Sequence, residues 1–407
     1  MPALLPSLRG LPRGYWFLWV GALVNRIGGF VAPFLAIYLT EGLHLPIERA
    51  GAVVSCYGLG VLIASPLGGH LADVVGRRPA ILASLTLGPA ALLLLGCARA
   101  PAAIAVAAFA YGLIGDVYRP VSQAIVADLV PPADRPRAFG ILYWAVNLGV
   151  AIAATLAGVM AKRSFWLLFV GDAATTLAFA AIVWRFVPET RPAAAAAARR
   201  SSPAELLSPL RDAAFAGFLV LVLLTALVFD QWFAALPLDM RAHGIPTDSY
   251  GLVMALNGVL IVLLQPTATA WLPRFRRSRV LAVSAFLVGA GSGLYAFARS
   301  ATGYALALAV FTLGEIAQAP VAPAVVADLA PVERRGSYQG LFLMAWGVAI
   351  VVTPLLGTWV LGRLGSSVLW GGCFAIGALC AAGHVALAPL RARRLMSLRD
   401  EAVMALD

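Results

Sequence analysis

Charged side chains are scarce in this sequence. Asp, Glu, Lys and Arg make up 12% of its 407 residues, whereas they make up about a quarter of a soluble domain. Hydrophobic residues make up 61%, and the mean hydropathy is +0.88. A soluble fold could not hide this much apolar surface, and many apolar stretches reach the roughly 20 residues that cross about 30 Å of hydrocarbon. We therefore predict a polytopic, all-α membrane protein.

The sequence also lacks the spacings that bind metals, nucleotides or disulfide partners. Its four cysteines lie inside apolar stretches, where Cys usually behaves as a small hydrophobe. Its four histidines have no metal-ligand spacing, and no glycine-rich loop is followed by Lys and Ser or Thr. We expect no cofactor, no metal, no direct use of ATP and no enzymatic activity. A membrane-embedded enzyme or receptor is kept as a remote alternative.

Twelve transmembrane helices are predicted from the apolar stretches between Gly, Pro and charged residues. They are residues 15–39, 50–72, 79–98, 102–130, 138–161, 165–187, 215–238, 250–272, 280–297, 304–330, 337–361 and 367–390. The first is expected to be retained, because no short apolar core with a cleavage site precedes it. This divides the chain into a six-helix half (1–187), a cytoplasmic linker (188–212), and a second half with a cytoplasmic tail (213–407).

The basic residues predict the orientation. They are spread in short clusters between apolar stretches, which argues against a nucleic acid partner. With both termini inside, 21 of the 30 are cytoplasmic, two are intramembrane and seven are external, namely Arg49, Arg99, Lys162, Arg163, Arg241, Arg299 and Arg363. Basic residues near helix ends stay on the cytoplasmic side. We expect a lipid-embedded monomer in a bacterial inner membrane, with both termini cytoplasmic.

An internal repeat at an offset of 200 residues supports two related halves. The segments 120–131 and 320–331 agree at eight of twelve positions, among them Asp128 and Asp328. The same offset pairs Arg77 with Arg277 and Gly140 with Gly340. Parallel repeats of this kind predict two pseudo-symmetric halves and a substrate cavity between them near the midplane.

A loop motif between the second and third predicted helices resembles a known family signature. It is Gly-His-Leu-Ala-Asp-Val-Val-Gly-Arg-Arg, with its characteristic residues at Gly69, Asp73, Gly76, Arg77 and Arg78. It is similar to the loop signature of the major facilitator superfamily, except at Val74, where the family usually has a basic residue. The resemblance implies a twelve-helix secondary transporter that works by alternating access.

Other segments resemble the multidrug:proton antiporter branch of that superfamily. They are Tyr-Trp-Ala-Val-Asn-Leu-Gly at 143–149, Leu-Gly-Glu at 313–315 and Gly-Ser-Tyr-Gln-Gly at 336–340. This implies proton-coupled export of small amphipathic compounds. The fifth predicted helix lacks the Gly-Pro signature of such antiporters, since residues 147–158 contain no proline. A proton-coupled importer or a facilitator of the same fold therefore stays open as the alternative.

Charges inside the predicted helices are candidates for function, because a charge near mid-bilayer costs several kcal/mol. Glu315 lies fourteen residues before Leu329, or roughly 21 Å along a helix, so we expect it to bind and release a proton. The resemblance implies the same role for Glu315 and a coupling role for Arg119. Asp116, one turn from Arg119, and Asp230 complete the predicted proton-coupling set. Asp230 could instead attract a cationic substrate, and each could be merely structural.

At the predicted cytoplasmic face, Asp73, Arg77 and Asp128 are expected to form a conformational latch. Asp73 should reach the amino end of the eleventh helix near Gly336, and Arg77 should neutralise Asp128 at a helix carboxyl end. The second half carries Arg276 and Arg277 but no matching Asp, which predicts contacts on one side only. A static loop salt bridge is the structural alternative.

Polar and aromatic residues predicted to line the substrate cavity come from both halves. They are Asn25, Arg26, Tyr38, Gln123, Tyr143, Trp144, Asn147, Gln231, Trp232, Asn257 and Gln265. Arg26 could hold an anionic group or neutralise one of the acids. Such residues also occur at membrane interfaces and in helix-helix bonds. Together they indicate a cavity for an amphipathic molecule, driven by the proton gradient.

Overall fold

The computed structural model describes residues 10–29, 31, 35, 38–45, 47–191, 203–245 and 247–404. Throughout these residues the regular elements are helices. In chain order they are α2 (Arg13–Ile27), η1 (Tyr38–Gly42), α4 (Ile47–Val74), α5 (Arg77–Cys97), α6 (Pro101–Gly115), α7 (Tyr118–Leu129), α8 (Arg135–Arg163), α9 (Phe165–Phe186), η2 (Pro203–Arg211), α11 (Ala213–Phe229), α12 (Gln231–Ala242), α13 (Thr247–Trp271), η3 (Leu272–Arg274), α14 (Arg277–Leu294), η4 (Tyr295–Phe297), α15 (Ala301–Leu329), η5 (Val332–Arg334), α16 (Arg335–Leu364), α17 (Ser366–Ala386) and α18 (Ala388–Met404).

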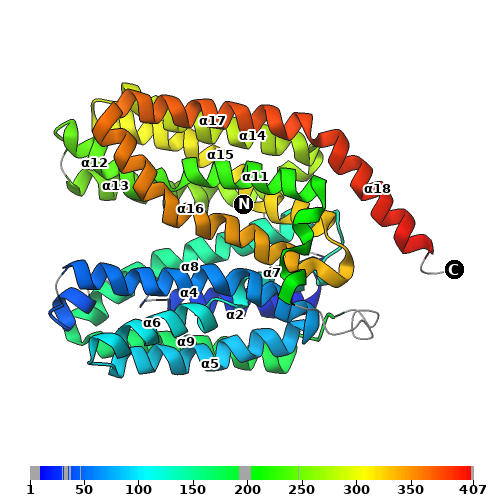
Figure 1. Cartoon of the computed structure of the whole chain (residues 1–407), viewed down its shortest axis with the longest axis horizontal. Coiled ribbons are helices and arrows are strands. Elements are labelled where there is room, and N and C mark those ends of the chain that lie inside the picture. The colour runs from blue at the N-terminus through cyan, green and yellow to red at the C-terminus, as the bar shows by residue number, and fades with distance from the viewer. Residues whose placement is uncertain are drawn as a thin grey trace.

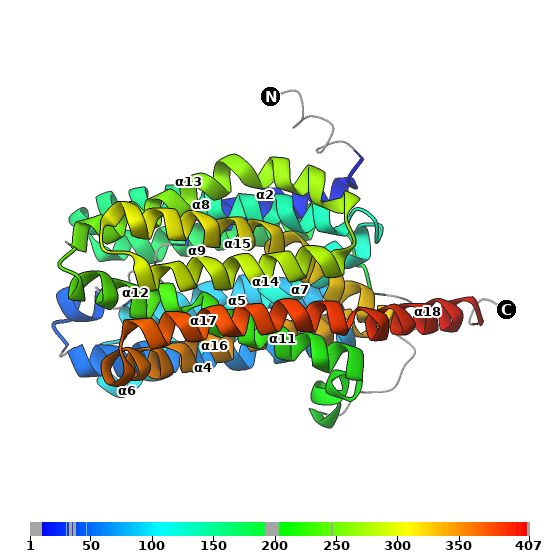
Figure 2. The ribbon, with the colours of Figure 1, turned by 90° about the horizontal axis from the view of Figure 1, so that it is seen from above.

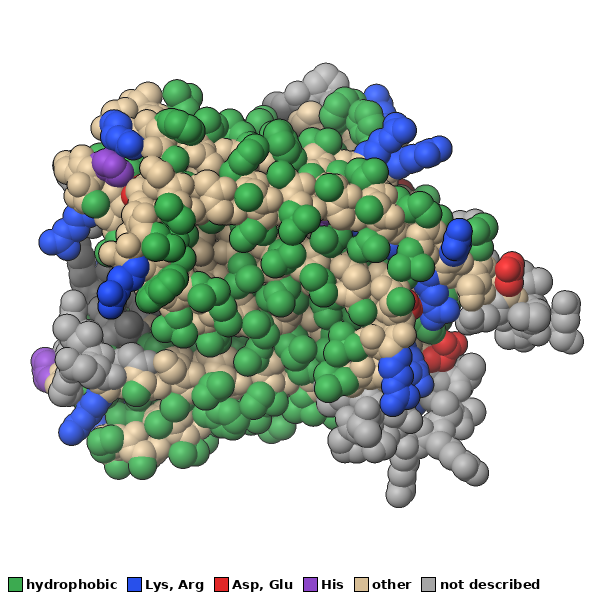
Figure 3. Space-filling model, turned by 45° about the horizontal axis from the view of Figure 1, so that its top comes forward, with side chains coloured by type: hydrophobic (Ala, Val, Ile, Leu, Met, Phe, Trp, Pro, Cys, Tyr) green, Lys and Arg blue, Asp and Glu red, His purple; other side chains and the backbone are tan. Residues whose placement is uncertain are grey.

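The helices have the length and composition that a bilayer requires. Among the described residues, nine helical segments are long and apolar enough to span a membrane, from Ala52–Val74 to Ser366–Ala386. Hydrophobic side chains cover the middle of the surface seen in Figure 3, and Lys and Arg gather toward its two ends. The prediction of an all-helical membrane protein is confirmed. Twelve spans in two pseudo-symmetric halves remain a prediction.

The helices run side by side along the long axis of the molecule. In Figure 1, α2 and α4–α9 lie below α11–α17. The two groups meet where α16 packs on α4 and where α8 packs on α13 and α15. Helix α18, in the expected tail, projects beyond the bundle (Figure 2). Of the expected linker, 192–202 lie outside the described residues, and Pro203–Arg211 forms the short helix η2.

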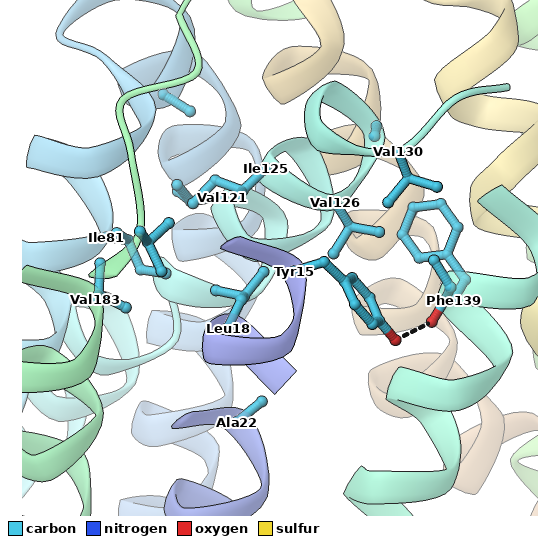
Figure 4. Close-up of a cluster of buried hydrophobic side chains, with 14 of the residues drawn as sticks. Tyr15, Leu18, Ala22, Ile81, Val121, Ile125, Val126, Val130, Phe139 and Val183 are labelled. Atoms are coloured by element: carbon cyan, nitrogen blue, oxygen red, sulfur yellow. Dashed lines mark hydrogen bonds between the residues drawn. The ribbon is translucent and has the colours of Figure 1, made fainter. Parts of the chain in front are cut away.

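Tightly packed apolar side chains hold the lower group together. Tyr15 and Leu18 of α2 lie fully buried with Val126 of α7 and Phe139 of α8, as Figure 4 shows. The Tyr15 hydroxyl donates to the Ala138 carbonyl at 2.8 Å, so its polar end is satisfied.

Two of the predicted helices are interrupted at an aspartate. The segment 102–130 is not one helix, because α6 ends at Gly115 and α7 begins at Tyr118. Pro120 has no N–H to give to the Asp116 carbonyl, which instead accepts from Arg119 N at 3.1 Å. Pro320 occupies the matching place within the continuous helix α15, so the Gly115-Asp116 pair, with its low helix propensity, contributes to the break. The segment 215–238 is interrupted at Asp230, between α11 and α12.

Candidate functional site

Glu315 lies where the two groups of helices meet. It is 6% exposed on α15, and both of its carboxylate oxygens accept hydrogen bonds. The Tyr143 hydroxyl of α8 donates to Oε1 at 2.5 Å, and Asn257 Nδ2 of α13 donates to Oε2 at 2.8 Å. Asn257 also reaches the Thr312 hydroxyl at 2.9 Å. Neutral donors from two neighbouring helices, α8 and α13, thus stabilise a buried carboxylate on α15.

Other predicted cavity residues surround this site. Asn147 donates to the Tyr143 carbonyl at 3.0 Å, and Trp144 donates from Nε1 to the Val262 carbonyl at 3.1 Å. The fully buried Gln265 donates to the Ile316 carbonyl at 3.2 Å. The structure therefore brings together five predicted residues around the α8, α13 and α15 junction: Tyr143, Trp144, Asn147, Asn257 and Gln265. We call these and Glu315 the Glu315 site.

A second group of predicted residues lies on α2 and at the α6–α7 break. Arg119 Nε is 3.0 Å from Asp116 Oδ1, which gives the expected pair. The Arg26 guanidinium lies over the Tyr118 ring, 5.8 Å from its centroid. Asn25 points to another neighbour, since its Nδ2 donates to Thr176 of α9 at 2.8 Å.

The remaining candidates lie apart from one another. Asp230 is buried at the break between α11 and α12, and Gln231 follows against Gly357 of α16. The Trp232 carbonyl accepts from Tyr250 at 3.1 Å. Tyr38 packs on Phe165 and Phe169 and donates to the Gly96 carbonyl at 3.2 Å, inside an apolar cluster of the lower group. Gln123 is half-buried on α7.

The loop motif makes the contacts expected of a latch. We call its side of the molecule the Asp73 end. Asp73 accepts from Gly336 N at 3.0 Å and from the Ser337 N and hydroxyl at 2.8 and 2.7 Å, at the start of α16. Arg77 lies 3.0 Å from Asp128 and donates to the Val332 carbonyl at 3.1 Å. The motif therefore joins the two groups of helices, and its role in conformational change remains a prediction.

The structure explains why the motif has glycine at positions 69 and 76 and shows what its second arginine, Arg78, contacts. Gly69 lies so close to α16 that a Cβ would fall 2.1 Å from the Gly336 carbonyl oxygen. Gly76 has φ +119°, a conformation that favours glycine, and turns the chain from α4 into α5. The Arg78 backbone N–H donates to Glu189 at 3.0 Å, and its guanidinium donates to the Trp184 carbonyl. Arg78 therefore fastens the motif within the first part of the chain.

The Asp73 end carries a crossed pair of ion clusters, so the expectation of contacts on one side only is wrong. Asp128 binds Arg77 and also Arg335 of α16, at 3.0 and 2.7 Å. Its repeat mate Asp328 binds Arg277 and also Arg135 of α8, the latter at 2.8 Å. Each aspartate thus pairs with one arginine from each part of the chain. The second half lacks a counterpart of Asp73 but retains this pairing.

Sequence analysis missed one buried acid. Asp239 of α12 is fully buried and accepts from the Tyr304 hydroxyl at 2.6 Å and from Trp370 Nε1 at 3.0 Å. Its Oδ1 lies 3.8 Å from His243 Nδ1. The predicted helix ends at residue 238, which leaves Asp239 just outside it. His243 lies four residues later, about one helical turn away, and this spacing could have indicated that the helix continues past residue 238 and that Asp239 has a partner on it.

Together, the apolar spans, the buried carboxylate at the junction and the crossed ion clusters define a multi-pass helical membrane protein with two groups of helices joined at one end. The sequence profile of the Major Facilitator Superfamily matches residues 18–239 and 232–401. The chain belongs to this superfamily and is a transporter of small molecules, not an enzyme. Among the described residues, no group of His, Cys, Asp and Glu could hold a metal ion.

Known relatives cover most of the chain. It is 24% identical over 364 residues to the Na(+), Li(+), K(+)/H(+) antiporter of Planococcus maritimus, covering 82% of this chain and 85% of the relative. It is 25% identical over 340 residues to the multidrug resistance protein MdtH of Aeromonas salmonicida, covering 80% and 82%. A bacterial homologue of the iron transporter ferroportin, in an outward-facing state, superposes with a TM-score of 0.77 at 15% identity, covering 93% of this chain and all of that one.

Proposed function

We propose that this protein is a proton-coupled exporter of small amphipathic compounds that works by alternating access between two six-helix halves. The observation that carries the proposal is Glu315, a buried carboxylate held by Tyr143 from the first part of the chain and by Asn257 from the second. The relatives named as a multidrug resistance protein and as a cation/H(+) antiporter support export and proton exchange.

The geometry suggests how a proton and a conformational change are linked. Tyr143 belongs to α8 and Glu315 to α15, so any motion that separates these helices removes a donor from the carboxylate. A buried carboxylate that loses a donor is better accommodated as a neutral acid. Glu315 then takes a proton from one side and releases it when Tyr143 returns. No cofactor is required, because the proton gradient supplies the energy.

The crossed ion clusters and Asp73 close one end of the bundle in this structure. We propose that this is the cytoplasmic end of a protein in a bacterial inner membrane, with both chain termini on that side. The distribution of basic residues supports this orientation. In this state the substrate site faces outward, and breaking the Asp73 contacts opens the cytoplasmic side.

The test measures proton-driven transport of fluorescent amphipathic dyes in proteoliposomes with an imposed pH gradient. Glu315→Gln keeps the size of the side chain but cannot release a proton. We expect the gradient-driven accumulation seen with the parent protein to fall at least tenfold in Glu315→Gln, while dye binding is retained. Glu333→Gln is the matched control, because Glu333 is exposed in η5. It should transport like the parent.

Two results would reject proton-coupled export. If the parent equilibrates dye without responding to the gradient, the protein is a facilitator. If the gradient drives dye in the direction of the proton flux, it is an importer. In the importer case Glu315→Gln still separates a coupling role from a purely structural one, since a structural role changes protein stability but leaves the gradient dependence intact.

A further inference from the structure

The arginines near the centre of the bundle lie in one part of the chain only, whereas acids occur in both parts. The first part carries Arg26 and Arg119, whose repeat mates at an offset of 200 are Ala226 and Ala319. The second part carries Asp230 and Glu315, and the mate of Glu315 is Gly115. Both arginines that are predicted to lie inside the membrane therefore belong to the first part. The repeat by itself would place equivalent residues in both parts of the chain. The restriction of these arginines to one part therefore reflects what the site binds and not a requirement of the fold.

The two arginines share one polar and aromatic surface, which we call the arginine wall: Arg26, Tyr57, Tyr111, Tyr118 and Arg119. Tyr57 of α4 and Tyr111 of α6 stack with ring centroids 5.5 Å apart. Tyr57 also lies within electrostatic range of Arg26, Arg119 and Asp116. Arg26 lies over the Tyr118 ring. Helices α2, α4, α6 and α7 thus present two cations among three phenol rings.

Only one of the two arginines in the arginine wall has a carboxylate in contact with it. Asp116 pairs with Arg119. Arg26 makes no ion pair within the described ranges, and its guanidinium lies over the face of Tyr118, a weak substitute for a carboxylate. The other nearby acid, Asp172 of α9, accepts from the Val31 backbone N–H at 3.2 Å. The wall therefore keeps one cation without a carboxylate partner.

The wall is also accessible. The Arg119 side chain is 42% exposed although it lies inside the span Pro101–Leu129, and Arg26 is half-buried. A guanidinium taken out of water needs a charged acceptor to offset its desolvation. Its planar set of N–H donors fits a carboxylate, sulfonate or phosphate, often through two parallel bonds. The flanking phenol rings would pack against an aromatic or apolar body.

We propose that the arginine wall binds the anionic group of the transported molecule, so that the substrate class is an amphipathic compound bearing a carboxylate or a similar anion. This deepens the proposed function and rests on it only for the claim that the bound compound is transported. Arg26 supplies the uncompensated cation, and Arg119 adds donors while keeping its pair with Asp116. An amphipathic cation without an anionic group would leave Arg26 unpaired.

Rhodamine B and its ethyl ester provide the test, because they share a ring system and a cationic charge and differ in a free carboxylate. Equilibrium binding of each dye to the purified full chain in detergent is measured by fluorescence anisotropy. The parent should bind the acid at least about tenfold more tightly than the ester, since a hydrogen bond to a charged group contributes about 1.5–3 kcal/mol. Arg26→Gln should remove most of this preference.

Arg119 needs a different variant, because removing it alone would strand Asp116. The double variant Asp116→Asn with Arg119→Gln removes the pair together and should also weaken binding of the acid. Arg363→Gln, at an exposed arginine near the end of α16, should leave both affinities unchanged. Equal or tighter binding of the ester, an acid preference that survives in both variants, or no binding of either dye would overturn the proposal. Loss of gradient-driven transport with the acid preference intact would reject proton coupling only.

Discussion

Tyr143 and Glu315 belong to parts of the chain that are 172 residues apart, yet they form a hydrogen bond of 2.5 Å. The sequence predicts that each lies in an apolar helix, with Glu315 as a proton-coupling residue and Tyr143 as a residue of the substrate cavity. It could not pair them, because the rotation of each helix about its axis is fixed only by its neighbours. The same holds for Asn257, and for Asp239, which the sequence did not place inside a helix at all.

Removing the Tyr143 hydroxyl tests how this pairing sets the proton exchange. In Tyr143→Phe, Glu315 loses a donor that stabilises its charged form, so the pH of half-maximal transport should move upward by about one unit. Transport rate as a function of pH in proteoliposomes measures this. Tyr15→Phe is the control, because the buried Tyr15 hydroxyl donates to the Ala138 carbonyl, away from Glu315. A pH profile that stays at the parental position in Tyr143→Phe would contradict the proposed coupling.

At the scale of elements, most predicted helices agree with the structure to within a few residues, because long apolar stretches between polar breaks can be read directly. The exceptions are interruptions of predicted helices at Asp116, at Asp230 and after Ile27, where α2 ends inside the predicted helix 15–39. The interruptions at Asp116 and Asp230 lie inside strongly apolar stretches, where hydropathy gives no sign of a break. Helices α4 and α16 approach closely at Gly69, and the only sign of this in the sequence is the glycine in the loop motif.

That close approach predicts a change in conformational balance for Gly69→Ala. A Cβ at Gly69 would fall 2.1 Å from the Gly336 carbonyl oxygen, so α4 and α16 must separate. We expect a several-fold rise in labelling of an introduced cysteine, Ala324→Cys, by a membrane-impermeant maleimide from the Asp73 side. Ala324 is fully buried among residues of the first part of the chain, which makes it a sensitive reporter. The background has the native cysteines replaced by alanine.

Gly58→Ala, on the same helix, is the control, because a Cβ there would meet nothing within 4 Å. Equal labelling of the Gly69 and Gly58 variants would show that α4 and α16 do not separate at this contact.

At the scale of the whole molecule, the crossed ion clusters hold the two groups of helices together at one end. Asp128 and Asp328 each take one arginine from either group, so opening this end breaks two inter-group pairs at once, Arg335 with Asp128 and Arg135 with Asp328. A pair that is largely buried strands a charge when one partner is removed, which costs several kcal/mol. The clusters can therefore bias the equilibrium between states without contacting the substrate.

A double-mutant cycle on Asp128 and Arg335 checks this. Asp128→Asn and Arg335→Gln should each raise maleimide labelling of Ala324→Cys. The double variant should show less than the sum of the two effects, because the pair is then removed whole. Asp134→Asn, at a partly exposed pair with Arg137 three residues away, is the control and should change nothing. Strictly additive effects would show that this pair does not link the two groups of helices.

The sequence by itself determined that the chain lies in a lipid bilayer, where most of its helices run, and that its two parts are related by a repeat. Too few charges and too many apolar stretches require a bilayer, and the register of 200 residues aligns Asp128 with Asp328 and Arg77 with Arg277. The sequence also predicted the pairs of Arg119 with Asp116 and of Arg77 with Asp128, whereas only the tertiary structure showed which charges meet across the two groups of helices. The crossed pairing of Arg335 with Asp128, the donors on Glu315 and the uncompensated Arg26 depend on contacts between distant helices. Contacts of this kind follow from packing, which no local pattern of residues encodes.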